Sequence, residues 1–184
     1  MEQKHQPSIA PTILAGDLVL RAHRADDHAA CLMLWSDPEV VRFIGGVPST
    51  AEDVWARILR YAGHWALMGY GYWVIETRTG AFVGEVGFAD FRRETSPSMG
   101  GAPELGYALL PAFQGRGLAT RAAGAALAWV RQALDPARTV CLINPEHRTS
   151  IRVAEKLGYA NPTRLTYRGR EQVLLERLEA SGST

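Results

Sequence analysis

The stretch "ELGYALLPAFQGRGLATRAAGAALAWV", residues 104–130, joins a strand-like run to an alanine-rich helix through a short loop. The run that starts at Glu104 stops at Pro111, and the helical pattern begins directly after Gly117. Gly115 and Gly117 have no Cβ, so a ligand can approach the main chain closely. Backbone amides left free at the start of a helix suit a bound anion. The loop therefore predicts an anion-binding site.

Two common phosphate loops are excluded by the same residues. A Walker-type loop needs Gly, four residues and then Gly-Lys-Ser/Thr, and the chain contains no such string. A dinucleotide fingerprint on Gly115 and Gly117 would need a third glycine where Thr120 stands. The pattern Gln/Arg-x-x-Gly-x-Gly/Ala is met by Gln114, Gly117 and Ala119. On this pattern alone, Gly-x-Gly can also be a tight connection before a well-packed helix.

The composition favours one domain with a real core. The chain has 184 residues, of which 47% are hydrophobic, and a formal net charge of +1. This charge gives no support to a nucleic-acid partner. We predict one domain over residues 13–179, with a flexible segment at 1–12 and a tail at 180–184. Cys31 and Cys141 lack metal-ligand spacing and are interpreted as buried reduced thiols.

Neither targeting nor membrane insertion is indicated. The first dozen residues, "MEQKHQPSIAPT", lack the apolar core of a secretory signal, and no stretch approaches the ~20 apolar residues of a membrane span. The default expectation is a cytoplasmic protein without a membrane partner. The histidines are scattered without paired ligand spacing, so no metal site is expected.

The chain alternates helical and strand-like patterns in a definite order. Helices are predicted up to about Trp35, after Pro38, from Thr50 to Gly69, after Gly117, and up to Gly158. Strands are predicted at residues 18–22, in a hairpin around Thr79-Gly80, at 104–110 and 138–144, and on both sides of Arg168-Gly169-Arg170. This order indicates a mixed α/β (α+β) domain around one sheet.

Two motifs in order resemble those of the Gcn5-related N-acetyltransferase (GNAT) superfamily. They are Gln114-Gly115-Arg116-Gly117-Leu118-Ala119 and the helix "SIRVAEKLGY", residues 150–159. More narrowly, the chain resembles the branch of ribosomal-protein N-terminal acetyltransferases of the RimJ/RimL type. The resemblance covers nearly the whole chain, from "LVLRAHRADD" to "YRGREQVLLERL".

The resemblance implies a splayed mixed sheet of six or seven strands with acetyl-CoA between the strands at 104–110 and 138–144. Main-chain groups of Leu109 and Leu110 are expected to bond the pantetheine arm and polarise the thioester. The pyrophosphate is expected on the loop and helix start, where Arg116 and the helix dipole assist. The implied cofactor residues are Leu109, Leu110, Gln114, Gly115, Arg116, Gly117, Leu118, Ala119, Thr120, Asn144, His147 and Ser150.

One position departs from the pattern of this branch. Relatives read Pro-Glu-Asn before the last helix, and that Asn side chain contacts the cofactor, whereas this chain has Pro145-Glu146-His147. His147 can donate one hydrogen bond and keep the contact, or it can be a solvated residue at the helix start. Asn144 can take part of the role.

Transfer of acetyl to an amine requires a neutral nitrogen, so a base is needed. Candidate bases are Glu85, Glu104 and Glu146; Glu85 lies in the apolar run "FVGEVGF", where an unpaired carboxylate is costly. Glu85 is either a residue of the substrate cleft or a paired structural group. Glu104 is either the base or a solvated residue at the end of a strand. Glu146 is expected to be a helix cap or a surface residue. Ser150 ranks above Tyr167 as the acid, and Tyr159 is expected in the core.

These inferences converge on an acetyl-CoA-dependent N-acetyltransferase that works by direct attack without a metal. The expected acceptor is a protein or peptide N-terminal α-amino group. A small amine (an amino acid, a polyamine or an aminoglycoside) is the alternative acceptor, and a non-catalytic acetyl-CoA sensor is the alternative class. The protein is expected to be a monomer or a homodimer. The tryptophans and Phe43 are expected to fill the core or line the acceptor groove.

Overall fold

The computed structural model describes residues 8–179. The predicted tail at 180–184 and residues 1–7 of the predicted N-terminal segment lie outside the described residues. Eight strands form one sheet in the order β1-β2-β3-β4-β5-β6-β8-β7. The strands are β1 (Ile13–Ala15), β2 (Leu18–Arg21), β3 (Tyr72–Thr77), β4 (Phe82–Ala89), β5 (Glu104–Leu109), β6 (Arg138–Ile143), β7 (Ala160–Tyr167) and β8 (Arg170–Leu178).

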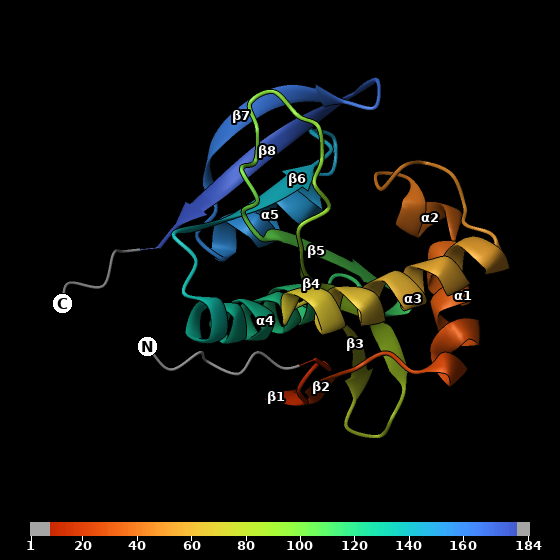
Figure 1. Cartoon of the computed structure of the whole chain (residues 1–184). Coiled ribbons are helices and arrows are strands. Elements are labelled where there is room, and N and C mark those ends of the chain that lie inside the picture. The colour runs from red at the N-terminus through yellow and green to blue at the C-terminus, as the bar shows by residue number, and fades with distance from the viewer. Residues whose placement is uncertain (1–7, 180–184) are drawn as a thin grey trace.

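The sheet has eight strands, one more than the upper number of the six or seven that the resemblance implies. The additional strand β1 pairs with β2 in a hairpin that turns at Gly16, where φ is +67°. Three residues are too short to give a readable period-two pattern. In Figure 1 this hairpin, in red, lies at one edge of the sheet, and the blue β7–β8 hairpin lies at the other.

The sheet splits between β5 and β6. All neighbouring strands pair antiparallel except these two, which run parallel and pair only at Glu104 and Val140. The Val140 N–H donates to the Pro103 carbonyl at 3.0 Å. Beyond this point the two strands diverge, which confirms the splay predicted for the sheet.

The helices follow the predicted pattern. They are α1 (His28–Trp35), α2 (Pro38–Val41), α3 (Ala51–Met68), α4 (Leu118–Leu134) and α5 (Arg148–Lys156), with 3-10 turns η1 (Ala25–Asp27) and η2 (Pro111–Phe113). The Thr50 side chain accepts the Asp53 N–H, and the Asp53 carboxylate accepts the Thr50 N–H, which fixes the start of α3. In Figure 1, α1, α2 and α3 lie together in orange and gold, apart from α5.

The main core lies between the sheet and α4. Ala122, Ala123 and Ala126 are fully buried there, so their small side chains let the helix approach the sheet closely. Trp65, Trp73 and Trp129 meet edge to face in this core, with ring centroids 4.8–5.4 Å apart. Trp35 is also buried, but Trp55 is 40% exposed on α3.

The two cysteines are both buried and free, which confirms their interpretation as reduced thiols. Over the described range, residues 8–179, no helix combines the length and apolar character needed to span a bilayer.

Candidate active site

The glycine loop leaves amides free at the start of α4. Gly115 and Gly117 have φ of +71° and +74°, a conformation that side chains rarely adopt, and a Cβ at either would meet nothing within 4 Å. No side chain caps the helix, and its first backbone bond runs from the Arg121 N–H to the Gly117 carbonyl. The N–H groups of residues 118–120 therefore face outward without a helical acceptor. This geometry suits an anion.

A groove of about 400 Å³ extends from this loop along β5. It is bounded by β5, by α2 with the segment after it, and by α5. Predicted cofactor residues that line it are Leu109, Gln114, Gly115, Gly117, Leu118, Ala119, Thr120, His147 and Ser150. The groove also contacts Tyr107, Ala108 and Phe43, which were not among them.

Three predicted cofactor residues do not line this groove: Leu110, Arg116 and Asn144. Arg116 is exposed, with its guanidinium 5.8 Å from the centre of the Phe113 ring. The Asn144 side chain accepts the Glu146 N–H at 2.9 Å, so its oxygen already serves the turn before α5. Glu146 itself is exposed, as expected of a surface residue.

Of the predicted pair Leu109 and Leu110, only Leu109 directs its main-chain groups toward the gap between β5 and β6. The Leu110 N–H donates to the Val83 carbonyl at 3.0 Å, so this amide stays paired with the β4 side, unlike the expectation. Main-chain groups alternate in direction along a strand, so those of Tyr107 and Leu109 turn toward the gap. The Gln114 side-chain amide donates to the Leu109 carbonyl at 2.9 Å and ties the loop to the strand.

His147 lies at the rim of the groove, at the N-terminal end of α5. Its ring stacks on Phe43 with centroids 4.5 Å apart, and Nδ1 is 3.1 Å from the Thr149 hydroxyl. Burial lowers the pKa of His147 below its usual value, which favours the neutral ring. The Phe43–His147 stack thus brings the segment after α2 against the start of α5 beside the groove.

Glu85 is a fully buried carboxylate on β4 and does not line the groove. His23 Nε2 lies 3.1 Å from one carboxylate oxygen, the Cys31 thiol donates to the same oxygen at 3.2 Å, and the Trp35 indole N–H donates to the other at 2.9 Å. In the β4–β5 ladder Glu85 stands opposite Ala108, which does line the groove. The structure therefore shows a hydrogen-bonded carboxylate on the strand next to the one that lines the groove.

The electrostatics of this network keep the carboxylate charged. Burial alone would raise the pKa of Glu85, but His23, Trp35 and Cys31 lower it below the usual value. Burial and the nearby Glu85 charge raise the pKa of Cys31, so the thiol stays protonated and donates. His23, Cys31 and Glu85 also offer one metal-ligating atom each within 4.8 Å of one another; in this structure those atoms are joined by hydrogen bonds.

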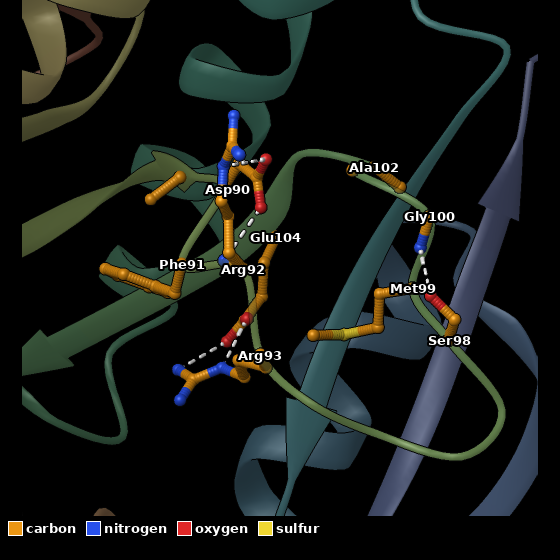
Figure 2. A pocket seen from close by; sticks show the side chains of 11 residues that line it. Asp90, Phe91, Arg92, Arg93, Ser98, Met99, Gly100, Ala102 and Glu104 are labelled. Carbon is orange, nitrogen blue, oxygen red and sulfur yellow. Dashed lines mark hydrogen bonds and ion pairs between the residues drawn. The ribbon is translucent and has the colours of Figure 1, made fainter.

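Glu104, at the start of β5, belongs to a different pocket. This pocket, of about 370 Å³, is formed by the loop between β4 and β5 and is shown in Figure 2. Arg93 binds both carboxylate oxygens of Glu104 at 2.6 and 2.9 Å, and its guanidinium lies 4.8 Å from the Phe91 ring centre and 4.9 Å from that of Tyr167. Tyr167, a candidate acid, is thus a neighbour of this pair.

The second charge pair of this pocket is formed by Asp90 and Arg92. One Asp90 oxygen accepts the Arg92 N–H at 2.8 Å, and the other lies 3.9 Å from Arg92 Nε. Figure 2 shows both pairs: Asp90, Arg92 and Arg93 lie on the loop, and Glu104 begins β5. The charged residues that line this pocket are two acids and two arginines, so the pocket carries no net charge.

Ser150, on the first turn of α5, reaches the groove together with Tyr107. The Tyr107 hydroxyl lies 2.8 Å from Ser150 Oγ and 2.9 Å from the Ser150 carbonyl oxygen, and it can donate its one proton to either. Tyr159 is 2% exposed and bonds Thr139 at 2.9 Å, so it is a core residue as expected. Tyr107 was missed by the sequence reasoning because its partner lies 43 residues away.

A family model described as an acetyltransferase (GNAT) domain matches residues 17–160. The chain belongs to the GNAT acetyltransferase family. YkkB from Bacillus subtilis (strain 168) is 32% identical to this GNAT domain over 157 residues, which are 81% of this chain and 86% of the relative. A solved structure described as a GnaT-family acetyltransferase from Bordetella pertussis shares 29% identity and a TM-score of 0.81, over 91% of this chain and 99% of that one.

Other solved structures share the GNAT fold at lower identity. RimL, described as a ribosomal L7/L12 alpha-N-protein acetyltransferase in complex with coenzyme A, has 17% identity and a TM-score of 0.73. It matches 91% of this chain and 98% of that one. Spermidine N-acetyltransferase from Vibrio cholerae, in complex with CoA and spermine, has 17% identity and a TM-score of 0.70. The match covers 88% of this chain and 95% of that one. The family model and the YkkB match accordingly show an acetyltransferase domain of the GNAT family.

Proposed function

We propose that this acetyltransferase acetylates the N-terminal α-amino group of a protein or peptide. We place the acceptor in the pocket at Glu104, because this residue begins β5, the strand that also lines the cofactor groove. The observation that carries the proposal is the charge balance of this pocket. A polyamine or aminoglycoside site needs carboxylates without a partner, whereas here Arg93 binds Glu104 and Arg92 lies beside Asp90. A neutral, polar pocket suits the main chain of a peptide better than a polycation.

The position of the two candidate bases supports the same acceptor, since the one acid that lines the cofactor groove is Glu39 on α2. Glu85 and Glu104 both lie outside the groove. At pH 7.5 roughly a third of an α-amino group is neutral, against about 0.1% of a lysine-like amine. The α-amino group is thus the acceptor that needs least help from a base. Among the structural neighbours, RimL is named for an α-amino acceptor on ribosomal protein L7/L12, and the Vibrio cholerae enzyme is named for spermidine.

In this proposal, acetyl-CoA lies along β5 with its pyrophosphate on the amides of residues 115–120. Arg116 and Asn144 remain proposed contacts, although they do not line the groove. Leu110 does not remain one, because its N–H and carbonyl are already paired with Val83 and Phe113. The amine attacks the thioester directly. Glu85 or Glu104 takes the proton through intervening water, and Ser150 hydrogen-bonds the leaving sulfur.

Two measurements test this function. Thermal melting with CoA at 100 times its dissociation constant should show ~2.7 kcal/mol of added stability. Thiol release is then compared for a peptide with a free N-terminus, the same peptide Nα-blocked with its lysine free, spermidine and an aminoglycoside. Turnover of the free N-terminus alone supports the proposal. Faster turnover of spermidine or of the blocked peptide would contradict the acceptor assignment, and binding without any turnover would favour a sensor.

A further inference from the structure

The hydroxyl pair of Tyr107 and Ser150 lies where the groove meets the narrow end of the split. The glycine loop, residues 114–117 (the anion loop below), forms one end of the groove. Tyr107 lies on β5 at the other end, three residues from the Glu104–Val140 pair. A molecule with phosphates on the loop places its opposite end beside Tyr107. In acetyl-CoA that end carries the sulfur, so this placement depends on the proposed function.

Tyr107 and Ser150 can share their protons in two ways. The phenol has one proton, and Ser150 offers two acceptors, its carbonyl oxygen at 2.9 Å and its Oγ at 2.8 Å. When the phenol donates to the carbonyl, the serine hydroxyl can donate only back to the phenol oxygen across this contact. When the phenol donates to Oγ, the serine proton is free to point into the groove.

The chemistry of the leaving group selects between these arrangements. An ammonium that becomes an amide loses two protons: one ends on the CoA sulfur and one in solvent. As the C–S bond breaks, the electron pair stays on sulfur and makes a thiolate. A hydroxyl that donates to this thiolate stabilises the charge that develops during the reaction.

We propose that Tyr107 is a positioning residue that turns the Ser150 hydroxyl toward the departing sulfur of CoA. Tyr107 stays protonated throughout, because burial raises the pKa of its phenol above the usual value. It acts by donating to Ser150 Oγ, and Ser150 is the group that touches the sulfur. The contact also joins β5 to α5 across the split, so it fixes the geometry of both walls.

The test follows the thiol of CoA in its complex with the protein, without any acceptor. The pKa of the bound thiol is read from the ultraviolet absorbance of the thiolate as the pH is raised. An ordinary thiol has a pKa of roughly 8.5. In the wild type the bound thiol should lie below this value, and Tyr107→Phe should raise it by about one unit, as expected for the loss of one hydrogen bond to a charged group.

Matched variants distinguish a specific effect of Tyr107 on Ser150 from a general disturbance of the fold. Tyr159→Phe removes another buried phenol, bonded to Thr139 in the core, and should leave the thiol pKa unchanged. Ser150→Ala should raise the thiol pKa as Tyr107→Phe does, and the double variant should resemble Ser150→Ala, since both act through one hydroxyl. Turnover should fall about tenfold in Tyr107→Phe at unchanged acceptor KM.

The outcomes distinguish this inference from the proposed function. CoA binding with an unchanged thiol pKa in Tyr107→Phe, or additive effects in the double variant, would overturn the role of Tyr107 only. A wild type that does not bind CoA would overturn the proposed function and the inference together. A fluorinated tyrosine at position 107 keeps the shape and donates more strongly, so it should lower the thiol pKa; a rise or no change would also refute the role.

Discussion

Glu85→Gln should destabilise the protein strongly, although the side chain keeps its shape. The carboxylate is fully buried, and its three neighbours are His23, Cys31 and the indole of Trp35. An amide carries no charge, and its NH2 group must replace one of the two oxygens that accept hydrogen bonds from Cys31 and Trp35. A hydrogen bond to a charged group is worth about 1.5–3 kcal/mol. We expect about 3 kcal/mol, because the remaining amide oxygen still accepts one hydrogen bond.

Thermal and urea unfolding measure this loss. For a chain of 150–250 residues, 1 kcal/mol corresponds to roughly 2–4 °C in Tm. The variant should therefore melt about 6–12 °C below the wild type. The matched control is Glu94→Gln, an exposed glutamate on the loop between β4 and β5, which should change the free energy of unfolding by less than about 0.5 kcal/mol.

The pH dependence of this difference has a definite sign. The folded pKa of Glu85 lies below its unfolded value, so the ionised carboxylate stabilises the fold above about pH 4.3. That stability is lost as the pH falls through the lower folded pKa. The gap in Tm between wild type and Glu85→Gln should accordingly be largest near neutral pH and shrink in acid.

Turnover at a temperature well below both melting points separates the structural role from the catalytic one. If Glu85 is also the base, Glu85→Gln keeps its affinity for acetyl-CoA and slows turnover at neutral pH. A variant that melts within 2 °C of the wild type, an estimate from the scale above, would refute the claim that a charged, fully paired carboxylate lies at this position.

Three further changes test the neighbouring features. Gly117→Trp should abolish the stabilisation by acetyl-CoA in thermal melts, since its side chain projects from the anion loop; unchanged stabilisation would contradict the pyrophosphate placement. Arg93→Met should lower stability by about 1.5–3 kcal/mol in urea unfolding, because Glu104 loses both of its hydrogen bonds, and Arg93→Lys should restore part of it. Phe43→Ala should speed CoA dissociation in stopped-flow binding, because the stack on His147 is lost; an unchanged rate would exclude this role.

Local signals made most of the fold predictable from the sequence. The cap at Thr50, the proline at the start of α2 and the turn around Thr79-Gly80 each act over a few residues, and each lies where the pattern predicted. The anion loop was readable for the same reason, since its requirement for glycine at positive φ is local. The short strand β1 was missed because it has too few residues to show a period.

The partners of the site residues were not predictable in this way. Glu85 could be recognised as an unusual carboxylate in an apolar strand, but His23, Cys31 and Trp35 lie 50–62 residues away in the chain. The packing of α1 against β4 brings Cys31 and Trp35 to Glu85, and His23 reaches it from the segment between β2 and η1. The pattern could therefore show that Glu85 needed partners, and could not show which residues provide them.

The loss of pairing on one side of β5 explains how a single strand can form the groove. Successive side chains of a strand point to opposite faces, so a strand inside a sheet presents every second residue to a ligand on one face. Tyr107, Ala108 and Leu109 are consecutive, and all three line the groove. That is possible because the ligand side is the open edge left by β6, where main chain and both rows of side chains are within reach. The acetyl donor would then be held largely by main-chain groups, which substitutions do not remove, so side-chain variants on this strand should affect turnover more than cofactor affinity.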